Sequence, residues 1–511
     1  MGVKHQHADY TNMMHRWQRC IDVCKGQDAI HEAGTLYLPR LKDQELGEYD
    51  NYRTRTPFYN ATWRTVVGLQ GMLFRKPPKV IVPSIVTPML DNITLSGTSL
   101  HIFVLEASEE CLKVGRVGIF VDFPIAPDNA TQADAISENY RPSMKMYSAT
   151  SIINWKTTTI KNKTVLSMVV IKEAVDIPKD EFEDVVGIQY RVLDLFQMGV
   201  PVANSNMESV KNVYRVRIFT VDAKTGDDIL MSTAYPTIKG EHLEEIPFQF
   251  IGVDDVSWKV DEPPLIDLVD MNLSHYRTTA DYEHGCHFTG LPTPVISGYT
   301  PDAEGEKFYI GSMTAWVFPR PDAKASYLEF TGQGLQSLKD NLDKKEGHMA
   351  ILGARMLEVQ VRGVESANTA AIHRGGEQSM LASVAQAISI GFQRALKTFC
   401  QFAGASSTED VRFDLNRDFF PVPMDALTLT ALIAGWQNSA YSYETMFENL
   451  KAGEIIALET TAEEEQAAIK ANPPPMLDAP TTPGNQEVKS PKPKETPATP
   501  APTITQLQNK K

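Results

Sequence analysis

Residues 265–290 read LIDLVDMNLSHYRTTADYEHGCHFTG and directly follow the pair Pro263-Pro264. Apolar side chains recur along this stretch at the spacing of one helix face, at Leu265, Leu268 or Val269, Asn272 or Leu273, Tyr276 and Ala280. The charged residues lie mostly on the other faces. The pattern predicts an amphipathic helix of about 25 residues, roughly 37 Å long at 1.5 Å per residue.

The same stretch contains possible metal ligands, namely His275, His284, Cys286 and His287. His284 and His287 are three apart and could share a helix face, whereas Cys286 points away and no carboxylate spacing completes a ligand set. The chain also lacks the HExxH, GxSxG, GxGxxG and GxxxxGK motifs in a suitable context. We therefore predict packing and helix-end roles for these side chains, with no catalytic residue, metal ion or cofactor. A metal-dependent hydrolase using residues 275–287 is the alternative.

A second long helix is expected after a segment rich in proline and glycine, residues 291–334, with short strands near 307–318. Apolar side chains there recur at alternating spacings of three and four, which is a heptad seam with one polar break at Lys345. Its members are Leu335, Leu338, Leu342, Lys345, Met349, Leu352 and Met356. Two long helices thus flank a small β-containing insert of about 44 residues.

The N-terminal part is expected to begin with helices. We predict a helix over residues 10–33, a loop over residues 34–50, and a helix with Pro57 in its first turn. Arg75 and Lys76 are expected in its last turn, before a proline pair that ends it.

Strands are expected next. Residues 80–125 form a short mixed segment, and residues 150–260 contain β-branched and alternating runs between turn signals, which predicts an antiparallel meander. The chain as a whole is therefore predicted to be α+β.

The C-terminal part is expected to be helical up to its tail. We predict a helical region over residues 366–402 with a kink at Gly375-Gly376, and further helices over residues 411–470. Ten of the 32 prolines fall from residue 472 onward, so this tail is predicted to be disordered.

Composition excludes some classes of function. The net charge is −15 and the pI about 5.3, which is wrong for a tight DNA binder but suits a surface that DNA passes without adhering. No apolar run approaches the ~18 residues that cross a bilayer, and we expect no secretory signal. Five scattered cysteines indicate a reducing compartment, with Cys20 and Cys24 in structural roles.

Two long helices would extend from the rest of the chain and return to it, with a small β insert between them. This would be unusual in a soluble monomer, because the apolar face of each helix can bury only part of the other. Copies standing side by side in a ring would cover both helices through a heterologous interface that closes.

Several segments carry a resemblance to a known family. They read YNATWRTVVGLQGMLFRKPPKV, RPSMKMYSATSIINW, PPLIDLVDMNLSHYRTTADYEHGCHFTGLPTPV, GHMAILGARMLE and SANTAAIHRGGEQSML. Over roughly residues 10–470 the chain resembles the portal, or head-to-tail connector, proteins of tailed bacteriophages. Such proteins form rings, usually of twelve copies, at one capsid vertex. DNA enters through the channel under a separate terminase motor and leaves the same way.

The resemblance implies a division of the chain. Its parts would be an N-terminal wing (1–260), a stem helix (261–290), a clip (291–334), a second stem helix (335–356), a tunnel loop and long kinked helix (357–403), a C-terminal wing or crown (404–471) and a Pro-rich tail (472–511). The crown segment is short, and the tail has no place in the common plan of the family.

The resemblance also implies sites and partners. Candidates for contact with DNA in the channel are Lys339, Lys344, Arg355, Glu358, Gln360, Arg362 and Glu365. Candidates in the clip for contact with motor and adaptor are Tyr299, Glu304, Lys307, Tyr309, Trp316 and Arg320. Expected partners are copies of the chain, the terminase large subunit, head-tail adaptor and tail proteins, major capsid and scaffolding proteins, and double-stranded DNA, with no membrane. The protein would be assembled in the bacterial cytoplasm and reside in the virion; another virion connector or adaptor ring is the further alternative.

Overall fold

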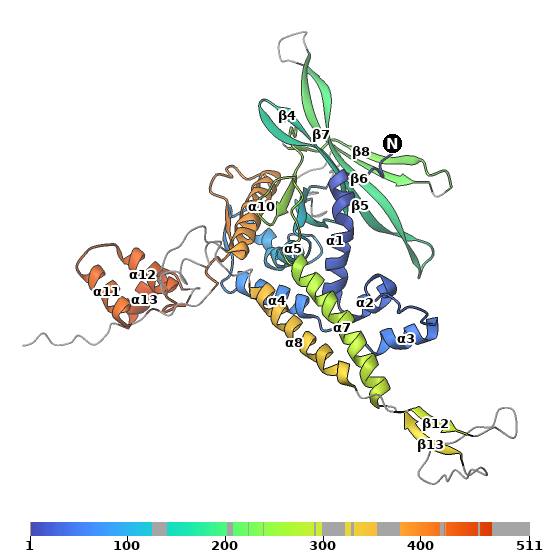
Figure 1. Cartoon of the computed structure of the whole chain (residues 1–511). Helices are drawn as coiled ribbons and strands as arrows, with labels where there is room; N and C mark the ends of the chain where they lie inside the picture. The colour runs from blue at the N-terminus through green and yellow to red at the C-terminus, as the bar shows by residue number, and fades with distance from the viewer. Residues whose placement is uncertain are drawn as a thin grey trace, which may run out of the picture. The chain divides into compact units, whose positions relative to one another are not determined.

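The computed structural model describes residues 2–124, 140–201, 208–222, 224–238, 240–290, 293–298, 322–328, 332–354, 379–419, 424, 426–457 and 460–472. The chain divides into two compact units, Met1–Val422 and Pro423–Lys511. Helices and antiparallel sheets both occur in the first unit (Figure 1), so the predicted α+β class is confirmed. Among the described helices, none combines the length and the apolar character needed to span a membrane.

Five short elements open the chain. They are α1 (Ala8–Lys25), α2 (Gln27–Ala33), the 3-10 helix η1 (Gly34–Leu36), α3 (Leu46–Arg55) and α4 (Ala61–Leu73). The single helix expected over residues 10–33 is wrong, because Gly26 has a φ of 94° and separates α1 from α2. The loop expected over residues 34–50 is also wrong in part. A capping box between Glu45 and Glu48 starts α3 inside it.

Helix α4 is shorter than its apolar spacing predicted. Asn60 caps its start, since its side chain accepts a hydrogen bond from the backbone of the first turn. The expected start at Pro57 is therefore wrong by about one turn. Arg75 and Lys76 lie beyond the helix end, and both bind the carboxylate of Asp418, at 2.8 and 2.7 Å.

Residues 80–125, predicted to be a short mixed segment, contain helix α5 (Leu100–Val114) and then a strand over Arg116–Asp122, so the prediction is confirmed, although it specified no helix there. The hydroxyl of Ser99 caps the first turn of α5, and Gly115, with a φ of 78°, ends it. Its buried residues include Leu100, Phe103, Ala107 and Cys111 at helical spacing, whereas Ile102 and Glu106 on another face are exposed, so α5 is amphipathic. Together with α10 (Met380–Phe402) it contributes much of the largest buried cluster.

The antiparallel meander predicted over residues 150–260 is confirmed by a five-stranded sheet in which consecutive strands are neighbours. Its strands are β4 (Ile152–Ile160), β5 (Lys163–Pro178), β6 (Asp184–Pro201), β7 (Glu208–Val221) and β8 (Asp228–Ala234). Lys161 and Asn162 join β4 to β5 and have φ of 49° and 62°, as a two-residue hairpin turn requires.

Smaller sheets join segments that are distant in sequence. A three-stranded sheet has the order β11 (Phe248–Gly252), β2 (Arg116–Asp122) and β3 (Ser143–Ser148). The two-stranded pairs are β1 (Lys79–Ile81) with β14 (Arg412–Asp414), and β9 (Thr237–Ile238) with β10 (Glu241–His242). The 3-10 helix η2 (Thr87–Asn92) follows β1.

The stretch that opened the sequence forms α7 (Ile266–Gly290) as a continuous helix, and α8 (Gln333–Ala354) packs beside it (Figure 1). Between them in the chain, β12 (Thr293–Ser297) pairs with β13 (Lys324–Leu328). Both helix predictions are confirmed, whereas the strands expected near residues 307–318 lie outside the described residues.

Helix α10 buries the predicted apolar stripe, which consists of Leu381, Val384, Ile388, Ala395 and Phe399. The kink expected at Gly375-Gly376 lies outside the described residues. In the second unit, the described helices are α11 (Ala426–Gln437), α12 (Tyr443–Ala452) and α13 (Ala462–Ala471). The tail predicted to be disordered also lies outside them, apart from residue 472.

Candidate functional site on the paired helices

The heptad seam of α8 is the face that turns away from solvent. Its described members are less exposed than their neighbours along the helix, with Met349 only 3% exposed. The two helices approach closely near the end of α7, where a Cβ added at Gly285 would lie 2.5 Å from the Leu335 side chain. The seam that the sequence predicted is therefore the contact between α8 and the body of the first unit.

Lys345, the polar break in that seam, bonds to α7. Its Nζ donates to the carbonyl oxygen of Ser274 at 3.0 Å and to Oγ1 of Thr278 at 2.5 Å. Burial, followed by the charge of nearby Arg277, lowers the pKa of the ammonium group. Lys345 therefore favours one register between α7 and α8, since a shift of one helix along the other would separate its ammonium group from both acceptors.

His275 directly follows Ser274 in α7 and is 5% exposed. Its Nε2 is 3.5 Å from a carboxylate oxygen of Glu346 on α8, and its Nδ1 is 3.4 Å from the hydroxyl of Thr279. Burial lowers the pKa of the imidazole more than the Glu346 carboxylate raises it. His275 is therefore a packed, neutral side chain at neutral pH.

The opposite side of α7 is tied to the N-terminal helices by polar contacts that the sequence did not reveal. Asn272 is fully buried, accepts hydrogen bonds from the backbone N–H and the hydroxyl of Thr62, and donates to the carbonyl of Tyr59. Tyr52 donates to Asp281 at 2.8 Å. These contacts hold α7 between α8 and the helices that precede it in the chain.

The possible metal ligands near the end of α7 pack against aromatic rings. His284 lies edge-on to Tyr52 at 5.3 Å and to Phe288 at 4.7 Å between ring centroids. His287 contacts the same phenylalanine ring at 5.8 Å. Within the described residues, no group of three or more His, Cys, Asp or Glu side chains could hold a metal ion.

The two N-terminal cysteines, Cys20 and Cys24, are both buried free thiols. Burial is the main cause that raises the pKa of each thiol to about 12. Both thiols thus remain protonated at neutral pH in this structure and pack as small apolar side chains.

The predicted contact residues are only partly described. Lys339 and Lys344 lie on the exposed side of α8, together with Asp340, Asp343 and Glu346, so that face mixes both signs of charge. The other channel candidates, Arg355, Glu358, Gln360, Arg362 and Glu365, lie outside the described residues. The clip candidates Tyr299, Glu304, Lys307, Tyr309, Trp316 and Arg320 do so as well.

Comparisons with known proteins add three findings. A family model described as "Domain of unknown function (DUF4055)" matches residues 264–403, which is less than half of the chain and runs from α7 to α10. No curated protein matches the chain.

Among solved structures, a chain from the neck of an empty GTA particle computed with C6 symmetry is 11% identical, with a TM-score of 0.36, and the match covers 78% of this chain and 90% of that one. A chain from the virion of a native gene transfer agent (GTA) particle is 11% identical, with 86% and 98% covered and a TM-score of 0.33. A chain from the neck of a native GTA particle computed with C12 symmetry is 12% identical, with 76% and 89% covered and a TM-score of 0.32. All three TM-scores are below 0.5, so these similarities do not by themselves indicate a function.

Proposed function

We propose that this chain is a portal subunit, which forms a ring with its own copies at a capsid vertex and conducts double-stranded DNA through the centre. The proposal rests on how little of helix α8 is buried. Within this described helix of 22 residues, only Met349 is buried. Helix α8 packs on its own chain through one narrow seam, and the rest of its surface is exposed. This exposed surface could pack against a second copy of the chain.

Exposed apolar side chains around the paired helices support this proposal. Ile351 on α8 is 53% exposed and Phe288 at the end of α7 is 48% exposed. On the hairpin between the helices, Tyr327 and Leu328 are 54% and 53% exposed. Adjacent copies would cover such side chains, and the removal of apolar surface from water would stabilise the ring.

The charge balance supports the DNA role. A chain of net charge −15 would give a ring with a strongly negative field, which repels phosphate and lets a duplex slide. Lys339 and Lys344 would supply scattered positive charges on the exposed face of α8. In this proposal the ring has no catalytic activity of its own. Residues 291–334 contact terminase and later adaptor proteins, and the protein resides in the virion.

Mass measurement and electron microscopy test the proposal. The purified chain, alone and with the scaffolding protein of its own particle, is expected to form a ring of about twelve copies with a central channel. Ile351→Asp should lower the ring fraction about tenfold, because it places a carboxylate in the proposed interface. Ile102→Asp is the matched control, since Ile102 on α5 is 49% exposed. A chain that stays monomeric under both conditions would refute the proposal.

A further inference from the structure

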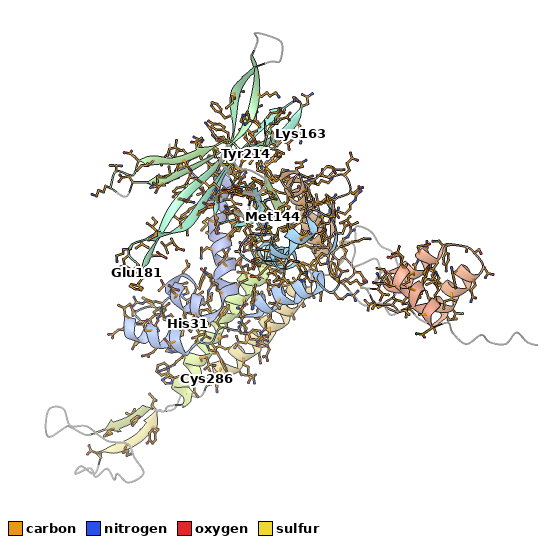
Figure 2. All side chains as sticks on the ribbon, turned by 180° about the vertical axis from the view of Figure 1, so that it is seen from behind. His31, Met144, Lys163, Glu181, Tyr214 and Cys286 are labelled. Carbon is orange, nitrogen blue, oxygen red and sulfur yellow. The ribbon has the colours of Figure 1, made fainter. Side chains whose placement is uncertain are left out.

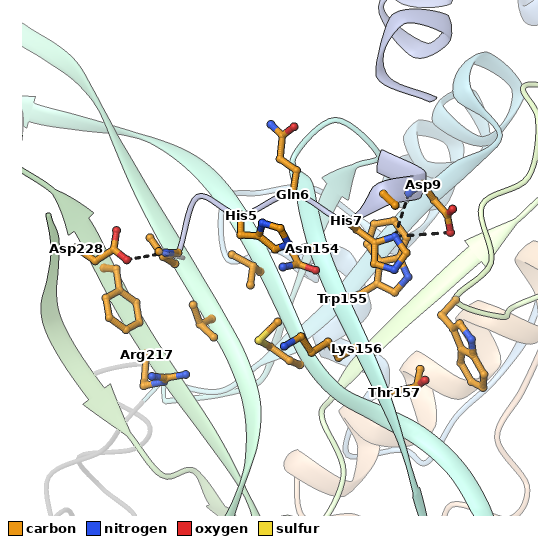
Figure 3. Close-up of a pocket in the computed structure, with 18 of the residues that line it drawn as sticks. His5, Gln6, His7, Asp9, Asn154, Trp155, Lys156, Thr157, Arg217 and Asp228 are labelled. Atoms are coloured by element: carbon orange, nitrogen blue, oxygen red, sulfur yellow. Dashed lines mark hydrogen bonds and ion pairs between the residues drawn. The ribbon is translucent and has the colours of Figure 1, made fainter. Parts of the chain in front are cut away.

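A pocket of about 940 Å³ lies over one face of the five-stranded sheet (Figure 3). Its floor includes apolar side chains from three neighbouring strands, Met168, Val170, Val192 and Phe219. Such a volume and an apolar floor with a few polar groups are typical of sites that receive a ligand or a partner's side chain.

The N-terminal segment before α1 forms one wall of this pocket. The backbone N–H of Val3 donates to Asp228 at 2.6 Å, and the N–H of His7 donates to the carbonyl of Ile153 at 2.9 Å. The imidazole of His7 also stacks on Trp155, with 4.1 Å between ring centroids. The wall is therefore held at both ends, and the pocket is formed before any partner arrives.

Several polar groups in the pocket have no partner within the described structure. Asn154 is only 6% exposed and its side-chain amide makes no hydrogen bond among the described residues. The ammonium groups of Lys156 and Lys259 have no carboxylate partner there. In contrast, the two carboxylates that line the pocket already have partners: Asp228 accepts a backbone N–H, and Asp9 lies 3.6 Å from the imidazole of His7. The free groups therefore favour an occupant that carries carboxylates and hydrogen-bonding groups.

The same chain has a surface of matching chemistry at the tip of the β5–β6 hairpin, where Glu181 is labelled in Figure 2. Phe182 is 92% exposed, and the tip residues 179–184 read KDEFED. The carboxylate of Asp180 accepts hydrogen bonds from the N–H groups of Phe182 and Glu183 at 2.8 and 2.9 Å. Glu183 also pairs with Lys179 at 2.7 Å, whereas Glu181, beside the exposed aromatic ring, has no ion-pair partner among the described residues. The turn is thus ordered, and an ordered tip loses little entropy on binding.

The tip cannot reach the pocket of its own chain. β5 and β6 are paired from the pocket floor at Val170 out to Pro178, and eight residues of strand span roughly 26 Å. Since the paired strands hold the tip at that separation, any such tip in the pocket comes from a second molecule.

We infer that the β5–β6 tip of one copy inserts Phe182 into this pocket of the next copy, with the carboxylate of Glu181 against Lys156 and Lys259. The inference deepens the proposed function and rests on its placement of copies side by side. Tip and pocket are different surfaces of one chain, so the contact is heterologous, as a closed ring requires. The basic groups attract the acidic tip, and the apolar floor takes the aromatic ring.

Site-directed cross-linking of full-length protein tests the inference. Two separately tagged variants, Glu181→Cys and Lys259→Cys, are mixed, assembled and treated with a short bismaleimide, and cross-linked peptides are identified by mass spectrometry. We expect a link between position 181 of one copy and position 259 of the other. Adding Phe182→Ala should reduce its yield about tenfold or more. Ile188→Ala, on the shaft of the same hairpin and at a site 48% exposed, should leave the yield within about twofold.

A charge exchange provides an independent readout. Glu181→Lys and Lys259→Glu should each lower the fraction of protein in rings, and the two variants mixed should recover it, because each supplies the partner of the other. Rings that form normally with Phe182→Ala and give no 181–259 link would overturn the inference and leave the proposed function standing. Links in small oligomers without any ring would support the inference and count against the ring. Links from position 259 to a different virion protein would overturn the inference.

Discussion

Replacement of Asn272 by alanine is expected to loosen the attachment of α7 to the N-terminal helices. Asn272 makes three hydrogen bonds while fully buried. One of them satisfies the N–H of Thr62, which belongs to the first turn of α4 and has no partner within its own helix. At about 1 kcal/mol for each bond, with a further penalty for the donor left buried, the loss should be about 3–4 kcal/mol.

Native-state hydrogen exchange is the suitable assay, because two units need not unfold together. Peptides covering α4 and α7 should exchange about 140- to 700-fold faster in Asn272→Ala, since 1.4 kcal/mol corresponds to a factor of ten. Asn51→Ala is the control: it changes an exposed residue of α3 and should alter stability by less than 0.5 kcal/mol. An effect below about 1 kcal/mol for Asn272→Ala would refute the reasoning, because it would mean that water replaces all three bonds.

Four further changes test other contacts in the first unit. Burial lowers the pKa of His275, so the unfolded chain binds more protons below about pH 6.5 and stability should fall as the pH drops through that value; His275→Gln should reduce this dependence in urea unfolding from pH 7.5 to 5. Burial opposes ionisation of Glu173, but its hydrogen bonds from Arg191 and neighbouring side chains outweigh it and lower the pKa, so Glu173→Gln should cost about 2–3 kcal/mol above pH 5 and less in acid. Gly118→Ala should cost about 1–3 kcal/mol in thermal unfolding, because its Cβ would lie 2.3 Å from a buried phenylalanine ring. Gly71→Ala, inside α4 with nothing near its Cβ, should instead stabilise the protein by about 0.5–1 kcal/mol.

The fold elements that could be predicted are those whose signal is local. Helix α7 and the seam of α8 follow from side chains repeating at helical spacing, because one face of each is buried and another is not. The meander follows from alternation and from turn residues between its strands. Helix α5 was missed although its buried residues Leu100, Phe103, Ala107 and Cys111 also recur at helical spacing. Its start at Ser99 and its end at Gly115 are likewise local signals, so this helix was predictable from the sequence.

In the candidate site, too, some features follow from the sequence and others only from the packed structure. The sequence indicated Lys345 as the polar break in an apolar seam, but only the packed structure shows that its ammonium bonds to Ser274 and Thr278. Asn272 was assigned to an apolar face, and nothing nearby in the sequence reveals Thr62 as its partner, since 210 positions separate them.

The sequence by itself determined that two long amphipathic helices bracket a short β-containing insert and that the chain is strongly acidic, since periodicity and charge are properties of neighbouring residues. The tertiary structure decided where each helix ends, which strands pair, and that residues 2–9 close a pocket over strands far along the chain. The physical reason is that a break such as Gly26, a buried hydrogen bond or a pocket wall depends on which distant groups are brought together, and that depends on the packing of the whole unit.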